Sequence, residues 1–312
     1  MKKWLWLCVA VMLLALAACG NEEEKGSNEG KAKEESSSDT VTYTKSDGTE
    51  IEVPADPKRV VVLAAYAGDV MKLGVNIVGV DSWSADNPEF KESLKDAAVV
   101  SNEDVEKIIE LEPDLIIGFD SIENGDKLAE IAPTVLFTYG EYDYLQQHIE
   151  IGKALNKEEE AKAWVEDFKK RAAEAGDKIK EKIGEEATIT VVENYDKQMY
   201  IFGDAWGRGT EVLYQAMGLK MPKAVEEAAL EPGYYAISQE VLGDYTGDYL
   251  LMSLVSDGQD TSFLEKDWFK KIGAVQKGHF IQVDAKSFYF NDASSLDYQL
   301  KVLEEAFAAI QP

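Results

Sequence analysis

Short runs of β-branched and aliphatic residues recur along the chain and alternate with segments of helical periodicity. Four of these runs lie in the first half and four in the second: Arg59–Leu63, Ile77–Val80, Asp114–Ile117, Thr134–Phe137, Thr188–Val192, Met199–Phe202, Tyr249–Met252 and His279–Val283. Strands that alternate with helices are typical of α/β proteins whose sheets are mainly parallel. The pattern therefore predicts two α/β lobes.

A long amphipathic segment lies between the two halves, over residues 157–184. It has no proline and one internal glycine, Gly176, and its apolar positions step by threes and fours from Ala161 to Ile183. This spacing places them on one face of a helix of about 27 residues, roughly 40 Å long. We expect one rigid connecting helix and little closure of the lobes. Two shorter helices broken at Gly176 are the alternative.

The N-terminal segment has the pattern of a secretory signal. Lys2 and Lys3 precede an apolar run that is too short to span a bilayer comfortably. The run ends Leu-Ala-Ala-Cys-Gly, which resembles the lipobox of bacterial lipoproteins, with Cys19 as the acylated residue; an ordinary cleavage site after Ala18 is the alternative. The next residues are almost all polar, so they cannot bury enough surface to become ordered.

These patterns together divide the chain into five segments. We expect a signal peptide over 1–18, lipidated Cys19 with a disordered tether over 19–40, a first lobe over 41–156, the connecting helix over 157–184 and a second lobe over 185–312.

Composition narrows the class of function. The 312 residues include 32 Lys+Arg, 59 Asp+Glu, two histidines and two cysteines, for a formal charge of −27. So acidic a surface repels phosphate backbones, which argues against nucleic-acid binding. Two histidines and two cysteines are too few for a zinc ribbon or a three-histidine metal site. No GxSxG, GxxxxGK[ST], HExxH or CxxC motif occurs. We expect a binding protein rather than an enzyme, with His148 and His279 at surface or strand-edge positions.

An acidic motif occurs once in each half. Glu106 precedes Asp114 by eight residues, Glu240 precedes Asp248 by eight, and each aspartate opens an apolar strand. The spacing alone favours the interpretation that both glutamates are merely favourable charges at helix N-termini. A docking role for the two is the alternative.

Aromatic residues stand near strand ends, where α/β proteins usually hold ligands. The first half offers Tyr66, Trp83, Phe119 and Tyr139, and the second offers Tyr200, Trp206, Phe288 and Tyr289. Each residue alone could equally belong to a core. Their joint placement predicts an aromatic-lined binding site.

Arg208 is one of only three arginines in the chain and stands between two glycines. Beside Trp206, its guanidinium could stack on the indole ring and present a fork of N–H donors to ligand oxygens. A surface salt bridge is the alternative.

Several of these segments carry a family resemblance. The Leu16–Cys19 string, the segments 54–62 and 111–117 and the long central helix resemble the iron-siderophore-binding lipoproteins of ABC transporters, a class that includes vitamin B12 and haem binders. The resemblance implies the class III periplasmic-binding-protein fold, with two Rossmann-like lobes joined by one long α-helix. It also implies a monomer, anchored through Cys19 on the extracytoplasmic face of a Gram-positive type cell membrane, which serves an ABC permease and its ATPase subunits.

Within this class, residues 200–209 and 287–292 are similar to ferric-hydroxamate receptors of Gram-positive bacteria. The ligand contacts that this implies are Arg208, Trp206 and Tyr200, followed by Tyr139, Tyr289, Phe288, Trp83 and Tyr66. The resemblance also assigns Glu106 and Glu240 to permease docking. Fe(III) is held only through the siderophore, so no intrinsic cofactor and no protein metal ligand are expected.

The chemistry of the ligand agrees with this assignment. Three hydroxamates around Fe(III) form a roughly neutral core, which suits aromatic walls and one arginine. A tricatecholate, with about three negative charges, or a citrate-type siderophore would favour several basic side chains. We therefore expect a receptor for ferric hydroxamates of the ferrichrome or ferrioxamine type; a receptor for a citrate-hydroxamate or catecholate siderophore, haem or cobalamin is the alternative.

Overall fold

The computed structural model describes residues 39–195, 198–255 and 260–311. The predicted signal peptide, Cys19 and nearly all of the tether lie outside the described residues. Within the described ranges, no helix combines the length and the apolar character that a bilayer crossing requires.

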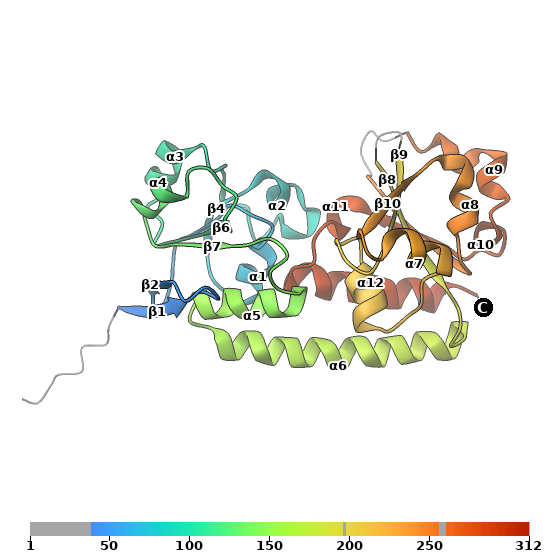
Figure 1. The fold of residues 1–312 in the computed structure, drawn as a ribbon, viewed down its shortest axis with the longest axis horizontal. Coiled ribbons are helices and arrows are strands. Elements are labelled where there is room, and N and C mark those ends of the chain that lie inside the picture. Colours follow the sequence, from blue (N-terminus) through green and yellow to red (C-terminus); the bar gives the residue numbers. More distant parts are fainter. Residues whose placement is uncertain (1–38, 196–197, 256–259, 312) are drawn as a thin grey trace, which may run out of the picture. The chain divides into compact units, whose positions relative to one another are not determined.

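The first lobe is built on a five-stranded parallel sheet with the strand order β5-β4-β3-β6-β7 (Figure 1). Its strands are β3 (Val60–Val62), β4 (Ile77–Val80), β5 (Ala98–Val99), β6 (Leu115–Phe119) and β7 (Thr134–Phe137). The intervening helices are α1 (Ala67–Lys72), α2 (Ser82–Asp86), the 3₁₀ turn η1 (Pro88–Phe90), α3 (Val105–Glu110) and α4 (Gly125–Ala129). α5 (Tyr144–Ala154) completes the lobe. Because helices cover a parallel sheet, all three residues of the central strand β3 are buried, and β4 and β6 are buried at all but one residue each.

The second lobe has a mixed sheet with the order β10-β9-β8-β11-β12. β8 (Ile189–Tyr195), β11 (Tyr249–Leu254) and β12 (Phe280–Asp284) are parallel, whereas β9 (Gln198–Phe202) and β10 (Tyr234–Ile237) extend the sheet in antiparallel fashion. Its helical elements are the π-helix η2 (Glu211–Ala216), α7 (Lys223–Ala229), η3 (Gln239–Val241), α8 (Leu242–Tyr245), η4 (Ser262–Glu265), α9 (Asp267–Lys270), α10 (Gly273–Gln276), α11 (Ala285–Phe288) and α12 (Ala293–Ala309). The α/β class predicted from the strand and helix pattern is confirmed.

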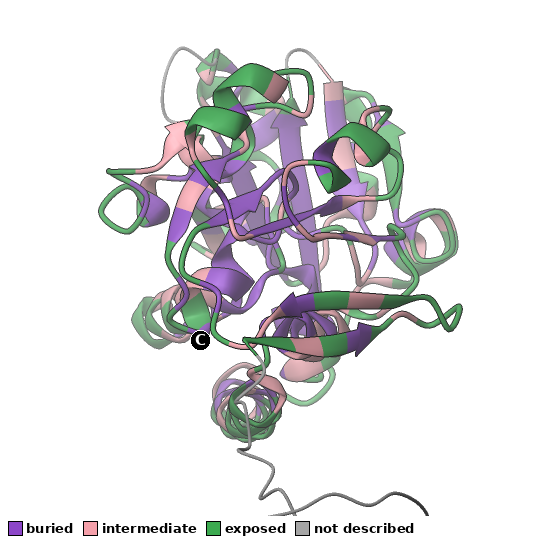
Figure 2. Cartoon of the chain, turned by 90° about the vertical axis from the view of Figure 1, so that its left-hand side faces the viewer, coloured by how far each residue is buried: buried purple, intermediate pink, exposed green. Residues whose placement is uncertain are grey.

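All eight predicted strands are present, and β4 and β7 have the predicted bounds. The pattern missed β10, the short β5 and the hairpin β1 (Thr40–Thr44) and β2 (Glu50–Pro54). Each hairpin strand buries only one side chain fully, Tyr43 or Val53, and β10 buries only Ile237. So little burial leaves a weak hydrophobic signal in the sequence. Figure 2 shows the difference between the buried central strands and the mostly exposed hairpin.

The connecting helix α6 (Glu158–Ile183) is continuous over 26 residues and packs on α5 of the first lobe and on η2 and α12 of the second. Gly176 does not break it. A Cβ there would lie 2.1 Å from the carbonyl oxygen of Met217, so glycine permits the backbone after η2 to approach the helix. Three glutamates in the first turn and two lysines in the last complement the helix dipole.

The two acidic motifs occupy equivalent places in the two sheets. Asp114 precedes β6 and accepts the backbone N–H of Arg59 at 2.9 Å, just before the neighbouring strand β3. Asp248 precedes β11 and accepts the N–H of Thr188 at 3.0 Å, just before the neighbouring strand β8. Each aspartate therefore ties together the starts of two central strands, which supports an internal repeat.

The lobes also meet directly, where α1 packs against α12. Asp69 accepts the N–H of Ala293 at 2.9 Å, and Ser294 Oγ donates to the carbonyl of Gly68 at 2.7 Å. His148 lies against this junction, with Nδ1 2.8 Å from Asp69. Its side chain is fully buried and in edge contact with Trp164, so the prediction of a surface or strand-edge histidine is wrong for this residue. Its neighbours on α5 gave no hint of the aspartate 79 positions earlier.

Candidate functional site

Aromatic side chains of the first lobe form one wall of a cavity at the carboxyl ends of its strands. Tyr66 follows β3, Phe119 ends β6 and Tyr139 follows β7. Ring centroids lie 5.0 Å apart for Tyr66 and Phe119, and 5.7 Å apart for Phe119 and Tyr139, with edge-on geometry in both pairs. Parallel strands place their carboxyl ends at one edge, and this brings together residues far apart in the sequence.

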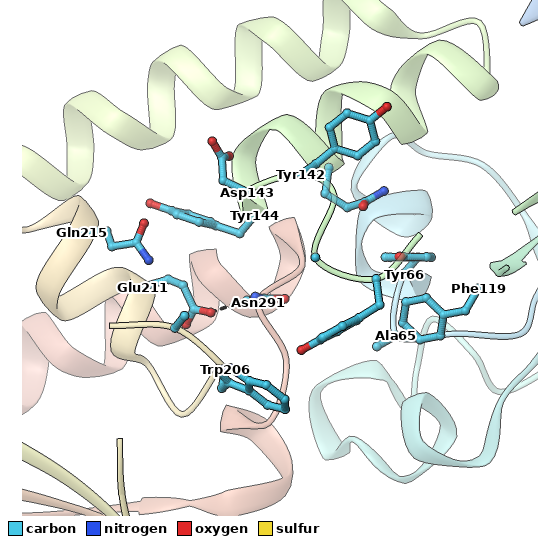
Figure 3. A pocket seen from close by; sticks show the side chains of 14 residues that line it. Ala65, Tyr66, Phe119, Tyr142, Asp143, Tyr144, Trp206, Glu211, Gln215 and Asn291 are labelled. Atoms are coloured by element: carbon cyan, nitrogen blue, oxygen red, sulfur yellow. Dashed lines mark hydrogen bonds between the residues drawn. The ribbon is translucent and has the colours of Figure 1, made fainter. Parts of the chain in front are cut away.

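The cavity has a volume of about 300 Å³ and is lined by residues of both lobes (Figure 3). Trp206 supplies the aromatic contact from the second lobe, with its ring 5.8 Å from that of Tyr139. Tyr144, Gln147, Glu211, Gln215 and Asn291 add polar groups to the lining. Tyr139 is 63% exposed and Trp206 44%, so both rings have free surface for a ligand.

A second hollow of about 280 Å³ lies beside Trp83 and Tyr289. Their ring centroids are 5.7 Å apart, so Trp83 of the first lobe meets Tyr289 of the second. Lys286 and Asp86 also line this hollow and form an ion pair across the lobes at 3.1 Å. The predicted residues Tyr66, Tyr139, Trp83, Trp206 and Tyr289 thus line one or the other of two hollows, which together we call the cleft. Arg208 links the two, because it bonds Trp206 O and lies over the Tyr289 ring.

Tyr200 lies behind this surface. It sits on β9, and its ring centroid is 5.9 Å from that of Tyr234, which in turn lies 5.4 Å from Trp206. Neither hollow includes Tyr200 in its lining. A direct ligand contact by Tyr200 stays a prediction, whereas its support of Tyr234 and Trp206 follows from the geometry.

Four consecutive residues, Trp206 to Gly209, have positive φ angles of 83°, 73°, 61° and 84°. This region of backbone space costs energy for tryptophan and arginine, so it must be held by its surroundings. Glu211, a buried residue, accepts the N–H of Gly207 at 3.0 and 3.1 Å, and Phe288 O accepts the N–H of Arg208 at 2.5 Å. A Cβ on Gly207 would lie 2.2 Å from Tyr289 O, so glycine is required there.

The contacts of the Arg208 side chain differ from those expected. Its guanidinium lies over the rings of Phe202 and Tyr289, at 5.0 and 4.9 Å, rather than on Trp206. Nε and Nη2 donate to the two carboxylate oxygens of Glu193 at 2.9 and 3.2 Å, and Nη1 donates to Trp206 O at 3.0 Å. The salt-bridge alternative is therefore present, but it lies below the surface: Glu193 is buried and Arg208 is half-buried. Of the five guanidinium N–H groups, two have no partner in the described ranges; their role in holding a ligand stays a prediction.

Phe288 requires a correction. Its side chain is 1% exposed and packs in the core of the second lobe, where its ring lies against Gly209. The predicted ligand contact by this ring is wrong, because the short helix α11 turns the side chain inward while Tyr289 faces the cleft. Phe288 contributes instead through its carbonyl oxygen, which holds Arg208.

The cleft tyrosines remain protonated at neutral pH. Burial raises the pKa of Tyr289 to about 12, with the charge of Glu193 as the next cause, and burial likewise raises the pKa of Tyr139. A protonated phenol donates and accepts hydrogen bonds. These hydroxyls can therefore pair with neutral or anionic oxygens of a ligand.

Glu106 and Glu240 are exposed, each in the first turn of its element, α3 or η3. A hydrogen bond from its own backbone N–H, followed by one from the Ser238 side chain, lowers the pKa of Glu240, so this side chain is charged at neutral pH. Their accessibility is compatible with docking, which stays a prediction.

The sequence interpretation missed several residues of the site. Glu193 is a charged residue within the apolar strand β8, a pattern that indicates a buried partner. Tyr142 and Tyr144 follow Tyr139 in an aromatic-rich run after β7, which could have been included. Glu211, Gln215 and Asn291 carry no such signal, because only the tertiary fold brings them to the cavity.

The chain matches known proteins over most of its length. The profile of the family described as periplasmic binding protein matches residues 60–287. The iron(3+)-hydroxamate-binding protein FhuD of Bacillus subtilis is 36% identical over 273 residues, which cover 85% of this chain and 86% of that protein.

Solved structures show the same similarity. The FhuD protein from S. pseudintermedius has a TM-score of 0.78 and 37% identity, over 88% of this chain and 99% of that chain. FhuD2 from Staphylococcus aureus with bound ferrioxamine B has a TM-score of 0.75 and 37% identity, over 80% and 98%. These similarities confirm the class III fold of two lobes joined by one long helix. The chain therefore belongs to the periplasmic binding protein family, on the branch that carries siderophore-binding proteins.

Proposed function

We propose that this protein is the solute-binding component of an iron ABC transporter and that it binds ferric hydroxamate siderophores in the cleft. The observation that carries the proposal is the continuous aromatic surface from Tyr66 through Tyr139 to Trp206, which joins the two lobes beside the half-buried Arg208. The relatives described above, among them iron(3+)-hydroxamate-binding FhuD and FhuD2 with ferrioxamine B, support this ligand class.

The charges of the cleft favour a neutral iron complex. Among the described residues, two cationic and four anionic side chains lie in or beside the two hollows: Arg208 and Lys286 against Glu193, Asp86, Asp143 and Glu211. Each cation is already paired with a carboxylate. A trianionic catecholate complex would find no uncompensated positive charge among these residues, whereas a neutral tris-hydroxamate complex needs none.

The polar groups suit the exposed oxygens of such a complex. The two remaining N–H groups of Arg208 and the protonated hydroxyls of Tyr139 and Tyr289 can donate to hydroxamate oxygens, and the aromatic rings can cover the organic shell. In this proposal, Fe(III) is cargo and keeps its ligands from the siderophore. The described residues contain no group of three or more His, Cys, Asp or Glu that could hold a metal.

The proposal also covers delivery of the bound siderophore to the permease. Glu106 and Glu240, one on each lobe, would dock on basic residues of the permease. Cys19 would carry the lipid that keeps the monomer on the extracytoplasmic face of the membrane, with residues 19–40 as a tether. We further propose that the protein binds its ligand without converting it, as a substrate-binding protein.

The test is a titration of tryptophan fluorescence with ferrichrome and ferrioxamine B, alongside a ferric tricatecholate, a ferric citrate-hydroxamate, haem and cobalamin. We expect micromolar or tighter quenching by the hydroxamates. Quenching by another member of the panel and by neither hydroxamate would refute the hydroxamate assignment in favour of that ligand.

Substitutions of two arginines test whether Arg208 belongs to the binding site. Replacing Arg208 with alanine should weaken hydroxamate binding by about 1–3 kcal/mol, the scale of a lost charged hydrogen bond. Arg171→Ala is the matched control, because Arg171 bonds Asp167 and Asp297 away from the cleft. An equal effect of both substitutions would show that Arg208 acts only through stability.

A further inference from the structure

A carboxylate is buried beneath the cleft, where it pairs with the guanidinium of Arg208. Glu193 lies on β8, the central strand of the second sheet, and is 3% exposed. The other side chains of Ile189–Asn194 are buried as well, so a charge at this position is costly without a partner. Both of its oxygens face the guanidinium in a two-pronged ion pair.

Further contacts hold the Glu193–Arg208 pair in position. The guanidinium lies over the rings of Phe202 and Tyr289, and Trp206 O accepts a third N–H. Ser253 Oγ, from the adjacent strand β11, lies 3.5 Å from Glu193 Oε2. The two unused N–H groups of Arg208 therefore have a defined direction, set largely by Glu193.

We propose that Glu193 sets the charge selectivity of the cleft: it cancels the positive charge of Arg208, so that the site accepts neutral ferric complexes and discriminates against anionic ones. The proposal rests on the proposed function and adds a specificity-determining residue that does not touch the ligand. Arg208 then acts as an oriented hydrogen-bond donor rather than as an anion receptor.

The neighbouring charges do not offset this arrangement. Lys286, the other cation beside the cleft in the described part of the chain, is paired with Asp86, and Glu211 adds a negative charge that is bonded to Gly207 N–H and Asn291. Without the Glu193 carboxylate, Arg208 would carry an uncompensated charge in a poorly solvated position, where it attracts anions more strongly than in water.

Three probes that share the same ferric tris-hydroxamate centre and differ in the charge of their terminal group test this selectivity. Ferrioxamine B carries a terminal ammonium, its N-acetyl derivative is neutral and its N-succinyl derivative is anionic. The measured quantity is the ratio of the dissociation constant of the succinyl probe to that of the acetyl probe, by tryptophan fluorescence of the full chain in detergent. The wild type should bind the neutral probe more tightly.

The substitution Glu193→Gln should lower this ratio about tenfold, as expected for one unit charge released at close range and partly screened. Adding Arg208→Gln to it should return the ratio to near the wild-type value. Glu186→Gln removes a carboxylate of the same lobe whose side chain is 86% exposed and paired with Lys220, and should leave the ratio unchanged.

A purely structural role would weaken all three probes equally, and an unchanged ratio in a folded Glu193→Gln protein would overturn the inference. If Glu193→Gln does not fold, the single variant Arg208→Gln tests the inference at pH 8. The Glu193 carboxylate that remains in this variant should raise the ratio. A lowered or unchanged ratio would overturn the inference. Failure of the wild type to bind any probe would instead overturn the proposed function, and the inference with it.

Discussion

Asp69 accepts a hydrogen bond from the backbone N–H of Ala293 at 2.9 Å, and this bond joins the first turn of α1 to the first turn of α12. The same carboxylate oxygen lies 2.8 Å from Nδ1 of His148. One buried oxygen therefore connects both lobes and the helix α5. Such a junction, in addition to α6, opposes large movements of one lobe against the other.

Loss of this carboxylate should destabilise the whole protein. Asp69→Ala leaves the Ala293 N–H and the His148 ring without their partner in a buried site, at a cost of about 2–4 kcal/mol in the free energy of unfolding. Urea unfolding followed by circular dichroism measures it. Asp177→Ala removes an exposed aspartate of α6 and should change stability by at most about 0.5 kcal/mol. Similar costs for the two variants would show that the junction contributes little.

Asp292 makes stability depend on pH at the same junction. Burial, with the charge of Asp69 next, raises the pKa of Asp292 from 3.8 to about 7. Between these values the folded state binds a proton that the unfolded state releases. This contribution to stability is thus complete below about pH 4 and is lost as the pH rises through 7.

Asp292→Asn should remove this dependence, because a carboxamide does not ionise in this pH range. The amide oxygen can still accept the N–H of Ser295, as Asp292 Oδ1 does. We expect the stability of the variant relative to wild type to rise by at least about 1 kcal/mol between pH 5 and pH 8. Urea midpoints of both proteins at the two pH values measure the change. A difference that is the same at both pH values would contradict the raised pKa.

The glycine at 233 positions Trp206 without any ligand contact of its own. A Cβ there would lie 2.3 Å from Trp206 Nε1, so Gly233→Ala must displace the indole. We expect siderophore affinity to fall about tenfold, the scale of a misplaced contact. Gly74→Ala is the control: it has a comparable φ of 71° and open space around it, so it shares the backbone strain but not the clash. Equal affinities of the two variants would exclude this role for Gly233.

The fold follows from the sequence because burial has a local pattern. Apolar runs such as Val60–Val62 indicate buried strands, and the spacing of Ala161, Phe168 and Ile179 predicts the buried face of α6. The hairpin β1–β2 was missed because each of its strands buries one side chain. Local patterns thus identify the elements that form the core.

The site was only partly predictable, because strand ends locate residues but do not orient them. Tyr289 and Phe288 are adjacent, yet one faces the cleft and the other the core. The partner of Arg208 is 15 positions away on strand β8, and that of His148 is 79 positions away on another helix. Such pairings depend on tertiary packing, which no local spacing encodes.

The central claim is that a hydroxamate complex binds between Trp83 and Trp206, and indole N–H signals of the chain without residues 1–19 test it most directly. Four tryptophans remain: Trp83 and Trp206 beside the cleft, and Trp164 and Trp268 outside it. Titration with the Ga(III) complex of ferrioxamine B, a diamagnetic substitute for the iron complex, should shift the NMR signals of Trp83 and Trp206 and leave those of Trp164 and Trp268 in place. Four unmoved signals, or shifts confined to Trp164 and Trp268, would contradict the account.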